Sequence, residues 1–536
     1  MLKKCTALVL ASVMGAACLL SGCNGKTTEI KAEQSTDKYR NFYEIFVNSF
    51  NDSNNDGVGD LQGVIDKLDY LNDGNPNGGD DLGIDGIWFM PIMQSASYHK
   101  YNVEDYCSID ENYGTMEDFD SLLSKCKERG INVIIDLVVN HTSNSHPWFK
   151  KAVEEVKQGN LDGYARYYHI VKKEDEVAGF TYRPIAGTDY FYESNFDVTM
   201  PELNLSEPKV REELHNIMKF WLDKGVSGFR LDAVKYFGSG GDDGKDFLTW
   251  MYSDAQSIKD DVYMVGEEWA GKSEISDYYD TGVDSFFNFP YAGADGKFES
   301  VVRSGGVVSL INGLKDWDNI LKKHNENAID APFLSNHDTT RSAVSLGKTD
   351  LVAQKTAAML YMLSPGNSFT YYGEEIGLLG NTGSDASFRI PMPWVGGECE
   401  NITIPNLSVE DAKAASQTTV EDAIADSNSL FHFYQQIIKL KLQNPEIQRG
   451  TIGNIYEGDT SATAGYITTY KDSSVIIVYN LNDADATINI TKEDLNYSGI
   501  AGQATAQNPD NDGKYPQATL DGTKVKIPSK TVVILK

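Results

Sequence analysis

The feature that most constrains the fold is an alternation of short apolar strands and helical segments that repeats along the chain. Segments with one apolar face, such as 61–71, 116–128, 210–223 and a last one at 427–442, read as helices between the strands. The first units recur every ~45 residues, a spacing typical of parallel βαβ units. Eight units over roughly 400 residues predict an α/β fold, a (β/α)8 barrel. We predict its strands at residues 41–50, 84–89, 131–138, 226–231, 262–266, 285–289, 331–334 and 368–372.

Two regions depart from this alternation. Residues 142–203, after the third strand, are rich in Tyr, Asp and Glu and lack a strong period, so we expect an inserted subdomain there. From residue 447 onward strand-like segments such as GYITTY and SVIIVYNL dominate, which predicts a C-terminal all-β sandwich domain at 447–536. The barrel is then expected to occupy residues 40–141 and 204–446. The C-terminal domain contains no tryptophan, so we favour a structural cap on the barrel over a carbohydrate-binding module.

The N-terminus has the pattern of an export signal. Lys3 and Lys4 precede an apolar run at 7–20, which is short for a spanning helix. Small residues then lead directly into Cys23, an arrangement that resembles a bacterial lipobox. This implies a signal peptide at 1–22, lipidation of Cys23 and a polar tether at 23–39. We therefore expect the protein at the outer face of the bacterial cell membrane, held there by its lipid anchor alone.

Charge and cysteine content exclude several classes of partner. The formal net charge of −31 makes nucleic acid and anionic membrane surfaces poor partners. The cysteines beyond residue 23 are Cys107, Cys126 and Cys399, an odd number without metal-like spacing. A disulfide scaffold is therefore not expected, and we predict a monomer.

A metal site is predicted in the loop after the first strand. Its sequence, DSNNDGVGD at 52–60, places oxygen donors at alternate positions around Gly57, as tight cation-binding loops do. It resembles the start of an EF-hand loop but has Gly63 at the twelfth position, where a bidentate Glu is needed. We expect structural Ca²⁺, with Mg²⁺ or a solvated acidic turn as alternatives. The candidate ligands are Asp52, Asn54, Asp56, Val58 and Asp60.

Polar side chains follow five of the predicted strands. In a barrel the carboxyl ends of the strands meet on one face, so these groups are expected to converge there. Three carboxylates, two histidines and an arginine, without a three-His cluster or an evident Ser or Cys nucleophile, suit glycoside cleavage, which needs one protonated acid and one ionised carboxylate. The groups are Tyr101, Asn140, His141, Arg230, Asp232, Glu267, His337 and Asp338.

Four motifs, in order, resemble the α-amylase family, glycoside hydrolase family 13: DLVVNHTS (136–143), GFRLDAVKY (228–236), VGEEW (265–269) and FLSNHD (333–338). The resemblance implies that Asp232 is the nucleophile, Glu267 the acid/base and Asp338 the transition-state stabiliser. Glu268 competes with Glu267 for its role, but the family's acid directly follows a glycine, here Gly266. The resemblance implies substrate contacts from Tyr101, His141, Arg230, Lys235, His337 and Arg341.

The specificity implied by the resemblance is mixed. The loop at 52–60 resembles that of oligo-1,6-glucosidases, and MPELN at 200–204 resembles a motif shared by α-amylases and neopullulanases. Lys100 and Asn102 stand where the family often has Gly and Asp. Ala233, where 1,6-cleaving relatives carry valine, and Lys235 favour α-1,4 bonds. We predict retaining, endo-type hydrolysis of α-1,4-glucans. An exo-acting α-glucosidase, a neopullulanase-like or transglycosylating enzyme, and a non-catalytic starch-binding lipoprotein are the alternatives.

Overall fold

The computed structural model describes residues 37–75, 78–238, 241, 243–380, 384–396, 402–492, 495–510 and 512–536. Within this part of the chain, seven parallel strands form one sheet in the order β11-β10-β9-β5-β2-β1-β12. Two isolated parallel bridges, Phe287–Ala331 and Phe333–Phe369, join the sheet's two edges through residues 331–333. The sheet therefore closes into the predicted eight-stranded barrel. Its strands are β1 (Asn41–Ile45), β2 (Gly86–Phe89), β5 (Asn132–Leu137), β9 (Gly228–Leu231), β10 (Tyr263–Gly266), β11 (Ser285–Phe286) and β12 (Ser368–Tyr371).

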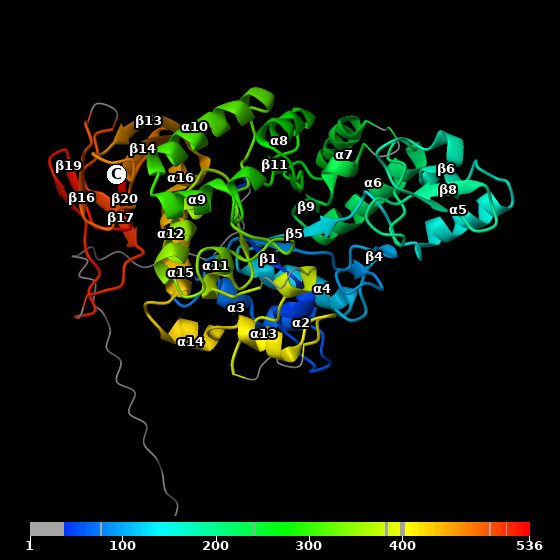
Figure 1. Cartoon of the computed structure of the whole chain (residues 1–536), viewed down its shortest axis with the longest axis horizontal. Coiled ribbons are helices and arrows are strands. Elements are labelled where there is room, and N and C mark those ends of the chain that lie inside the picture. The colour runs from blue at the N-terminus through cyan, green and yellow to red at the C-terminus, as the bar shows by residue number, and fades with distance from the viewer. Residues whose placement is uncertain are drawn as a thin grey trace, which may run out of the picture.

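Helices surround the barrel (Figure 1). Helix α4 begins with a reciprocal capping box between Thr115 and Asp118, and α6 ends at Gly225, whose φ of 109° favours glycine. The helices of the barrel are α1 (Val47–Phe50), α2 (Leu61–Asp66), α3 (Leu68–Leu71), α4 (Met116–Glu128), α6 (Pro208–Lys224), α7 (Gly244–Ile258), α8 (Lys272–Tyr278), α9 (Lys297–Ser304), α10 (Val307–His324), α11 (Ser342–Ser345), α12 (Leu351–Met362), α13 (Val409–Ala415), α14 (Val420–Ala425) and α15 (Leu430–Gln443).

Several predicted elements are shorter in the structure. The first strand ends at Ile45, and the next residues form α1, because the 52–60 loop folds back onto this turn. The Gly59 amide donates to the carbonyl of Asn48 at 2.8 Å, and a Cβ at Gly59 would lie 2.1 Å from the Val47 carbonyl. The predicted helix at 61–71 breaks at Lys67 into α2 and α3. The predicted seventh strand is reduced to the two bridges that close the barrel.

The barrel interior is filled by apolar side chains that alternate with outward-facing residues along each strand. Phe42 stacks on Phe369 at 4.7 Å and on Tyr263 at 5.3 Å, and Trp88 packs against Phe287 at 5.3 Å. This packing plugs the amino-terminal part of the barrel and leaves polar groups at the carboxyl ends of the strands. Those ends are where a site is expected.

The segment predicted as an inserted subdomain, 142–203, carries elements that lie at one end of the molecule (Figure 1). It contains α5 (Pro147–Lys157) and a three-stranded sheet ordered β6-β8-β7. The aromatic ring of Phe149 packs edge-on against Tyr168 and Tyr192, both at 5.0 Å. The strands are β6 (Ile170–Lys172), β7 (Tyr182–Pro184) and β8 (Tyr190–Glu193), and a further hairpin of β3 (Met93–Gln94) and β4 (Asp105–Ile109) follows β2.

The C-terminal region packs two antiparallel sheets together at the opposite end of the molecule (Figure 1). Helix α16 (Pro445–Arg449) precedes it and spans the predicted boundary at 446/447. The five-stranded sheet contains β13 (Thr451–Glu457), β14 (Thr463–Tyr470), β15 (Ser473–Asn480), β20 (Thr531–Leu535) and β17 (Ile500–Thr505). The three-stranded sheet contains β16 (Ala486–Asn489), β19 (Lys524–Ile527) and β18 (Thr519–Asp521). In the part of the chain described here, no helix is both long and apolar enough to cross a bilayer.

Candidate active site

The carboxyl ends of the barrel strands open into a cleft of about 540 Å³, a volume ordinary for a small-molecule or oligomer site. The inserted unit contributes one wall through Phe196, Asp197 and Met200. The cleft gathers side chains from sequence positions more than 200 residues apart. The predicted residues that line it are Tyr101, His141, Asp232, Lys235, Glu267 and Asp338.

Arg230, on β9, is the centre of the site and is 1% exposed. Its Nη1 donates to Asp136 at 2.9 and 3.0 Å and to Asp232 at 2.6 Å. Its Nη2 lies 2.9 Å from Oε1 of Glu267. Arg230 and Asp232 lie two residues apart at the end of one strand, which puts both on the same side, as the sequence predicted. One guanidinium thus orients two carboxylates of the cleft.

Burial raises the pKa of both Asp232 and Glu267, while the charge of Arg230 opposes that rise. For Glu267, the neighbouring charges of Asp232 and Asp338 raise the pKa further. Oε2 of Glu267 also accepts the Ala233 amide at 3.1 Å, so the side chain is held from both oxygens. Acid-catalysed glycoside cleavage requires one carboxyl that keeps its proton and one that is ionised, and both the charge and the hydrogen bond of Arg230 favour the ionised form of Asp232.

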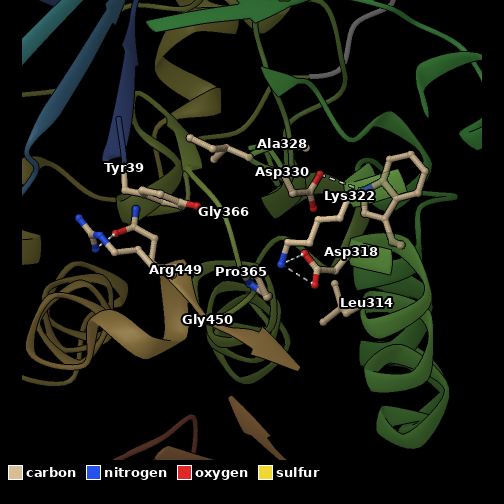
Figure 2. A pocket seen from close by; sticks show the side chains of 13 residues that line it. Tyr39, Leu314, Asp318, Lys322, Ala328, Asp330, Pro365, Gly366, Arg449 and Gly450 are labelled. Atoms are coloured by element: carbon tan, nitrogen blue, oxygen red, sulfur yellow. Dashed lines mark hydrogen bonds and ion pairs between the residues drawn. The ribbon is translucent and has the colours of Figure 1, made fainter. Parts of the chain in front are cut away.

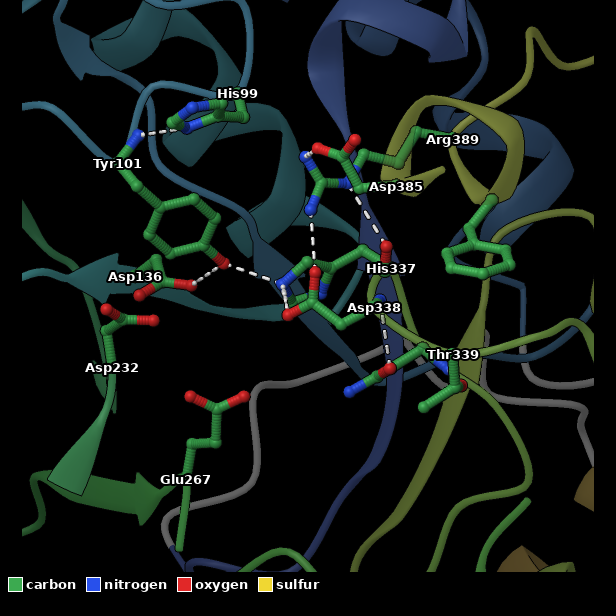
Figure 3. A network of polar contacts seen from close by, with 12 residues as sticks. His99, Tyr101, Asp136, Asp232, Glu267, His337, Asp338, Thr339, Asp385 and Arg389 are labelled. Carbon is green, nitrogen blue, oxygen red and sulfur yellow. Dashed lines mark hydrogen bonds and ion pairs between the residues drawn. The ribbon is translucent and has the colours of Figure 1, made fainter. Parts of the chain in front are cut away.

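Asp338 is held by two cations on the far side of the cleft (Figure 3). Its Oδ1 accepts from Nη2 of Arg389 at 2.6 Å, and its Oδ2 lies 3.0 Å from Nε2 of His337. Burial alone would raise the pKa of Asp338, but His337 and Arg389 hold it well below its usual range. Tyr101 completes the wall, because its hydroxyl lies 2.8 Å from Nε2 of His337 and donates to Asp136 at 3.1 Å.

His141 lines the cleft. Its Nδ1 lies 3.2 Å from Nδ2 of Asn140, while its buried Nε2 has no hydrogen-bond partner among the described residues. Burial lowers the pKa of His141 to about 4, so the ring is neutral. Asn140 in turn donates to Glu202 of the inserted unit, which fixes the ring's orientation. A neutral imidazole held in this way suits a hydrogen bond to a sugar hydroxyl.

The structure separates Glu267 from its neighbour Glu268. Only Glu267 lines the cleft, whereas Glu268 is 2% exposed and faces away from it. Burial raises the pKa of Glu268 to about 7, and its Oε2 is unpartnered within the described chain. Successive residues at a strand end point to opposite sides, which explains the difference.

Three predicted substrate contacts, Arg230, His337 and Arg341, are buried and do not line the cleft. Arg341 does not reach the cleft: its guanidinium packs on the rings of Tyr371 and Tyr372 and donates to the carbonyls of Phe388 and Tyr372. It is buried because its side chain supports the loop that follows β12. The arginine in the cleft is Arg389, which sequence reasoning missed. Arg389 lies in the segment SFRIPMPW, which has no period or charge pattern that distinguishes it.

The backbone at Lys100 explains how the chain departs from a Gly-Tyr-Asp pattern next to Tyr101. Lys100 has a φ of 65°, a conformation that glycine adopts more readily. Its buried ammonium bonds Asp110 at 2.8 Å and the Ser95 carbonyl at 3.0 Å. This anchoring offsets the backbone strain and holds Tyr101 in place. Asn102 turns its amide to Thr199 at 2.8 Å, in the inserted unit.

The predicted metal loop is a tight turn of side chain-to-backbone hydrogen bonds. Asp52 accepts from four successive amides, those of residues 54–57, and Asp60 accepts from Ser53 and caps α2 at Gly63. The carboxylate, amide and carbonyl oxygens of the loop are of the kinds that bind Ca²⁺. Within the described chain, however, no three His, Cys, Asp or Glu side chains are gathered closely enough to hold a metal. The acids would have to converge on binding.

A second, smaller cavity lies at the other end of the barrel (Figure 2). Its lining residues Tyr39, Asp330 and Gly366 each precede a barrel strand, which places the cavity at the amino ends. Its volume of about 30 Å³ suffices for roughly one water molecule. Burial raises the pKa of Asp330 to about 6, and its carboxylate accepts from Trp317 and Asn288 at 3.0 Å. The cavity is too small for a sugar.

Two sets of sequence predictions lie outside the described residues. They are the signal peptide with the lipidated Cys23, and Cys399. Of the described cysteines, Cys107 is exposed and Cys126 is buried, and both are free thiols.

Comparisons with known proteins agree with this geometry. Residues 44–450 match the catalytic domain of α-amylases. The chain is 37% identical over 463 residues to α-amylase 3 of Dictyoglomus thermophilum, covering 85% of this chain and 87% of that one. It is 29% identical over 541 residues to an oligo-1,6-glucosidase of Bacillus cereus, covering 85% and 93%. The solved structure of Eubacterium rectale Amy13B superposes with a TM-score of 0.83 at 36% identity, covering 94% and 96%.

The cleft, its three carboxylates and these similarities converge on one assignment: the chain belongs to the α-amylase family and is a glycoside hydrolase acting on α-glucans.

Proposed function

We propose that this protein is a retaining, endo-acting hydrolase of α-1,4-glucosidic bonds in starch and maltodextrins. The observation that carries the proposal is that Asp232 and Glu267 both contact the guanidinium of Arg230. Asp338 lies across the cleft from them and contacts the cationic side chains of His337 and Arg389. A retaining reaction needs a nucleophilic carboxylate and a protonated acid close together, and a third charge to stabilise the cationic sugar.

In the first step the ionised Asp232 attacks the anomeric carbon, and the bond from that carbon to the glycosidic oxygen breaks. Glu267 gives its proton to the leaving oxygen, so the released glucan leaves as a neutral alcohol. Arg230 favours the ionised form of Asp232 through the 2.6 Å contact. Positive charge that develops on the sugar ring is stabilised by Asp338, whose pKa is held low by its two cations.

In the second step the roles of Glu267 reverse. The carboxylate now takes a proton from a water molecule, whose oxygen attacks the anomeric carbon and releases Asp232. Two successive inversions give net retention. His141 and Tyr101 are proposed to bind the sugar at the cleavage point, His141 through its unpartnered Nε2 and Tyr101 through its ring.

The rim of the cleft supports binding of a chain rather than a single sugar. Phe196 and Trp269 are 47% and 50% exposed, unusual values for large apolar side chains, and both line the cleft. Phe196 packs on Tyr236 at 4.7 Å and Trp269 stacks on Phe289 at 4.8 Å, so both rings are fixed in place. Rigid aromatic faces are suited to stack on glucose rings beyond the cleavage point.

The preference for α-1,4 bonds rests on two residues that follow Asp232. Ala233 lines the cleft with a small side chain, and Lys235 presents an exposed ammonium on the same wall. The runner-up is cleavage of α-1,6 bonds, which the similarity to an oligo-1,6-glucosidase supports. Ala233 has a φ of 52°, where a β-branched residue is strained.

A product profile tests the proposal. Digests of soluble starch should give maltooligosaccharides of mixed length early, and kcat/KM for maltotriose should exceed that for isomaltotriose at least about tenfold. Ala233→Val should narrow this ratio at some loss of thermal stability, whereas Ala233→Gly, which tolerates the backbone conformation, serves as the control. Release of glucose alone from starch would favour an exo-acting α-glucosidase. A preference for isomaltotriose would favour cleavage of α-1,6 bonds.

We further propose that the 52–60 loop binds a structural Ca²⁺, with Asp52, Asn54, Asp56, Asp60 and the Val58 carbonyl as its ligands. The loop is separate from the catalytic acids in its hydrogen bonds, so a stabilising role is expected.

Anchoring to the outer face of a bacterial membrane through Cys23 is likewise a proposal, supported by the sequence pattern. Radiolabelled fatty acid on the wild-type protein, absent from Cys23→Ser, is the expected result.

A further inference from the structure

We propose that Glu44, on β1, is a positioning residue of the active site: it binds the imidazole of His337 from behind and thereby keeps Asp338 ionised and aimed at the substrate. The importance of Asp338 rests on the proposed function, but the link from Glu44 to His337 does not. Glu44 lies in the segment NFYEIF, outside the motifs that resemble the α-amylase family.

The strand places Glu44 inside the barrel. Phe42, two residues earlier, is in the interior aromatic layer, and alternate residues of a strand face the same side. Glu44 is therefore one layer above Phe42, toward the carboxyl ends, and is 1% exposed. Its Oε1 lies 2.6 Å from Nδ1 of His337. Its strand neighbour Tyr43 points the other way, into the layer between barrel and helices, where its hydroxyl donates to Glu375.

His337 thus has a carboxylate on each ring nitrogen. Nδ1 faces Glu44 at 2.6 Å and Nε2 faces Asp338 at 3.0 Å. A neutral imidazole carries one N–H and would direct a lone pair at one of these carboxylates. Only the imidazolium satisfies both contacts. Burial alone would lower the pKa of His337, but the charges of Asp338 and Glu44 raise it to about 10.

The other charged and titratable groups around His337 contact parts of the residue other than Nδ1. Tyr101, from the loop after β2, approaches Nε2 at 2.8 Å, and the Trp88 ring meets the imidazole edge-on at 5.7 Å. Arg389, after β12, donates to the His337 carbonyl at 3.1 Å. Arg230 on β9 and Asp136 on β5 lie beyond Tyr101. Glu44 is the carboxylate that meets Nδ1.

Glu44, His337 and Asp338 therefore form a series of alternating charges that runs from the barrel interior to the cleft. Glu44 favours the cationic form of His337, and cationic His337 in turn favours the ionised form of Asp338. Burial raises the pKa of Glu44 itself, and the charge of His337 and its hydrogen bond to Glu44 oppose that rise. Removing the charge of Glu44 should leave Arg389 as the main cation on Asp338 and weaken catalysis without abolishing it.

The test compares Glu44→Gln with Glu375→Gln in the full-length enzyme. Glu375 is an equally buried carboxylate whose partners are the hydroxyls of Tyr43 at 2.7 Å and Tyr70 at 2.5 Å, away from the cleft. The first readout is ¹⁵N NMR of the His337 ring, assigned by its absence in His337→Asn. Wild type and Glu375→Gln should keep the imidazolium to about pH 9, and Glu44→Gln should lose the proton by about pH 8.

The second readout is kinetic. On maltoheptaose at pH 8, Glu44→Gln should lower kcat at least about tenfold with KM changed less than about threefold, because Asp338 acts in the transition state. Glu375→Gln should stay within about twofold of wild type in both constants. Glu44→Asp keeps the charge and should restore most of kcat, which separates charge from packing.

Two results would overturn the proposal: an unaltered His337 titration in Glu44→Gln, or a Glu44→Asp enzyme as slow as Glu44→Gln while His337 stays protonated. If Glu44→Gln does not fold, the Glu44→Asp titration and kinetics alone decide. Since the NMR experiment uses no substrate, its outcome is independent of the proposed function. Failure of the function on α-1,4-glucans would show in the wild-type kinetics instead.

Discussion

At the scale of single residues, the adjacent acids Glu267 and Glu268 show that the direction in which a side chain points determines whether it can act on a substrate. Burial raises the pKa of both acids, yet only Glu267 lines the cleft and contacts Arg230. Glu267→Gln should therefore lower kcat for starch by about two to four orders of magnitude, the range typical of a lost acid/base. Glu268→Gln is the matched control and should retain activity within severalfold.

The protonation state of Glu267 also sets how the rate of cleavage depends on pH. In the proposed mechanism Glu267 carries a proton in the first step, and its pKa is raised by burial and by Asp232 and Asp338. The rate of cleavage should therefore stay high at pH values above the ordinary range of a glutamic acid and fall as pH rises through the raised pKa. Glu268→Gln should keep this alkaline limb. An unchanged limb in Glu267→Gln with near-normal kcat would instead transfer the role to another group.

At the scale of elements, short strands that end in polar residues were predictable and the loops between them were not. Arg230 and Asp232 were placed together because the two-residue period of a strand is fixed by backbone geometry. Arg389 was missed and Arg341 misassigned, because both lie in loops whose paths depend on tertiary packing. Glu44 was passed over since a single acid in an apolar strand carries no local signal of its partner, His337, 293 residues away.

The loop at 52–60 supplies a prediction at the same scale. If it binds Ca²⁺, saturating metal should stabilise the folded state by mass action and raise the melting temperature on the order of a few degrees, and a chelator should reverse this. Asp56→Asn should remove the response. The control is Asp510→Asn, a turn carboxylate that likewise accepts backbone amides, from Asp512 and Lys514. Identical melting curves with and without chelator would exclude the metal.

At the scale of the whole molecule, the barrel and the C-terminal sheet share one apolar core. Along β15, Val475, Ile477 and Tyr479 belong to the core that includes the barrel helices, while Ile476 and Val478 pack against the three-stranded sheet. The five-stranded sheet is therefore covered on both faces. This supports its role as a cap on the barrel.

Ile477→Ala should accordingly destabilise the entire protein by about 2–5 kcal/mol, as for other large-to-small core changes, while one cooperative transition remains. The kcat for starch at 25 °C should be unchanged, because the substitution leaves the cleft intact. Thr487→Ala, an exposed change on β16, should alter stability by less than about 0.5 kcal/mol. Calorimetry that showed the C-terminal sheets melting separately from the barrel would contradict the shared core.

The central claim is that Asp232 forms a covalent bond to the sugar, and mass spectrometry of a trapped intermediate tests it most directly. In Glu267→Gln, α-maltosyl fluoride can still react because fluoride leaves without an acid, but the missing base slows attack by water. The protein should gain one maltosyl unit, located by peptide mapping on Asp232 and absent from the Asp232→Asn, Glu267→Gln double variant. A label on any other residue, or turnover to inverted product without a label, would contradict the account.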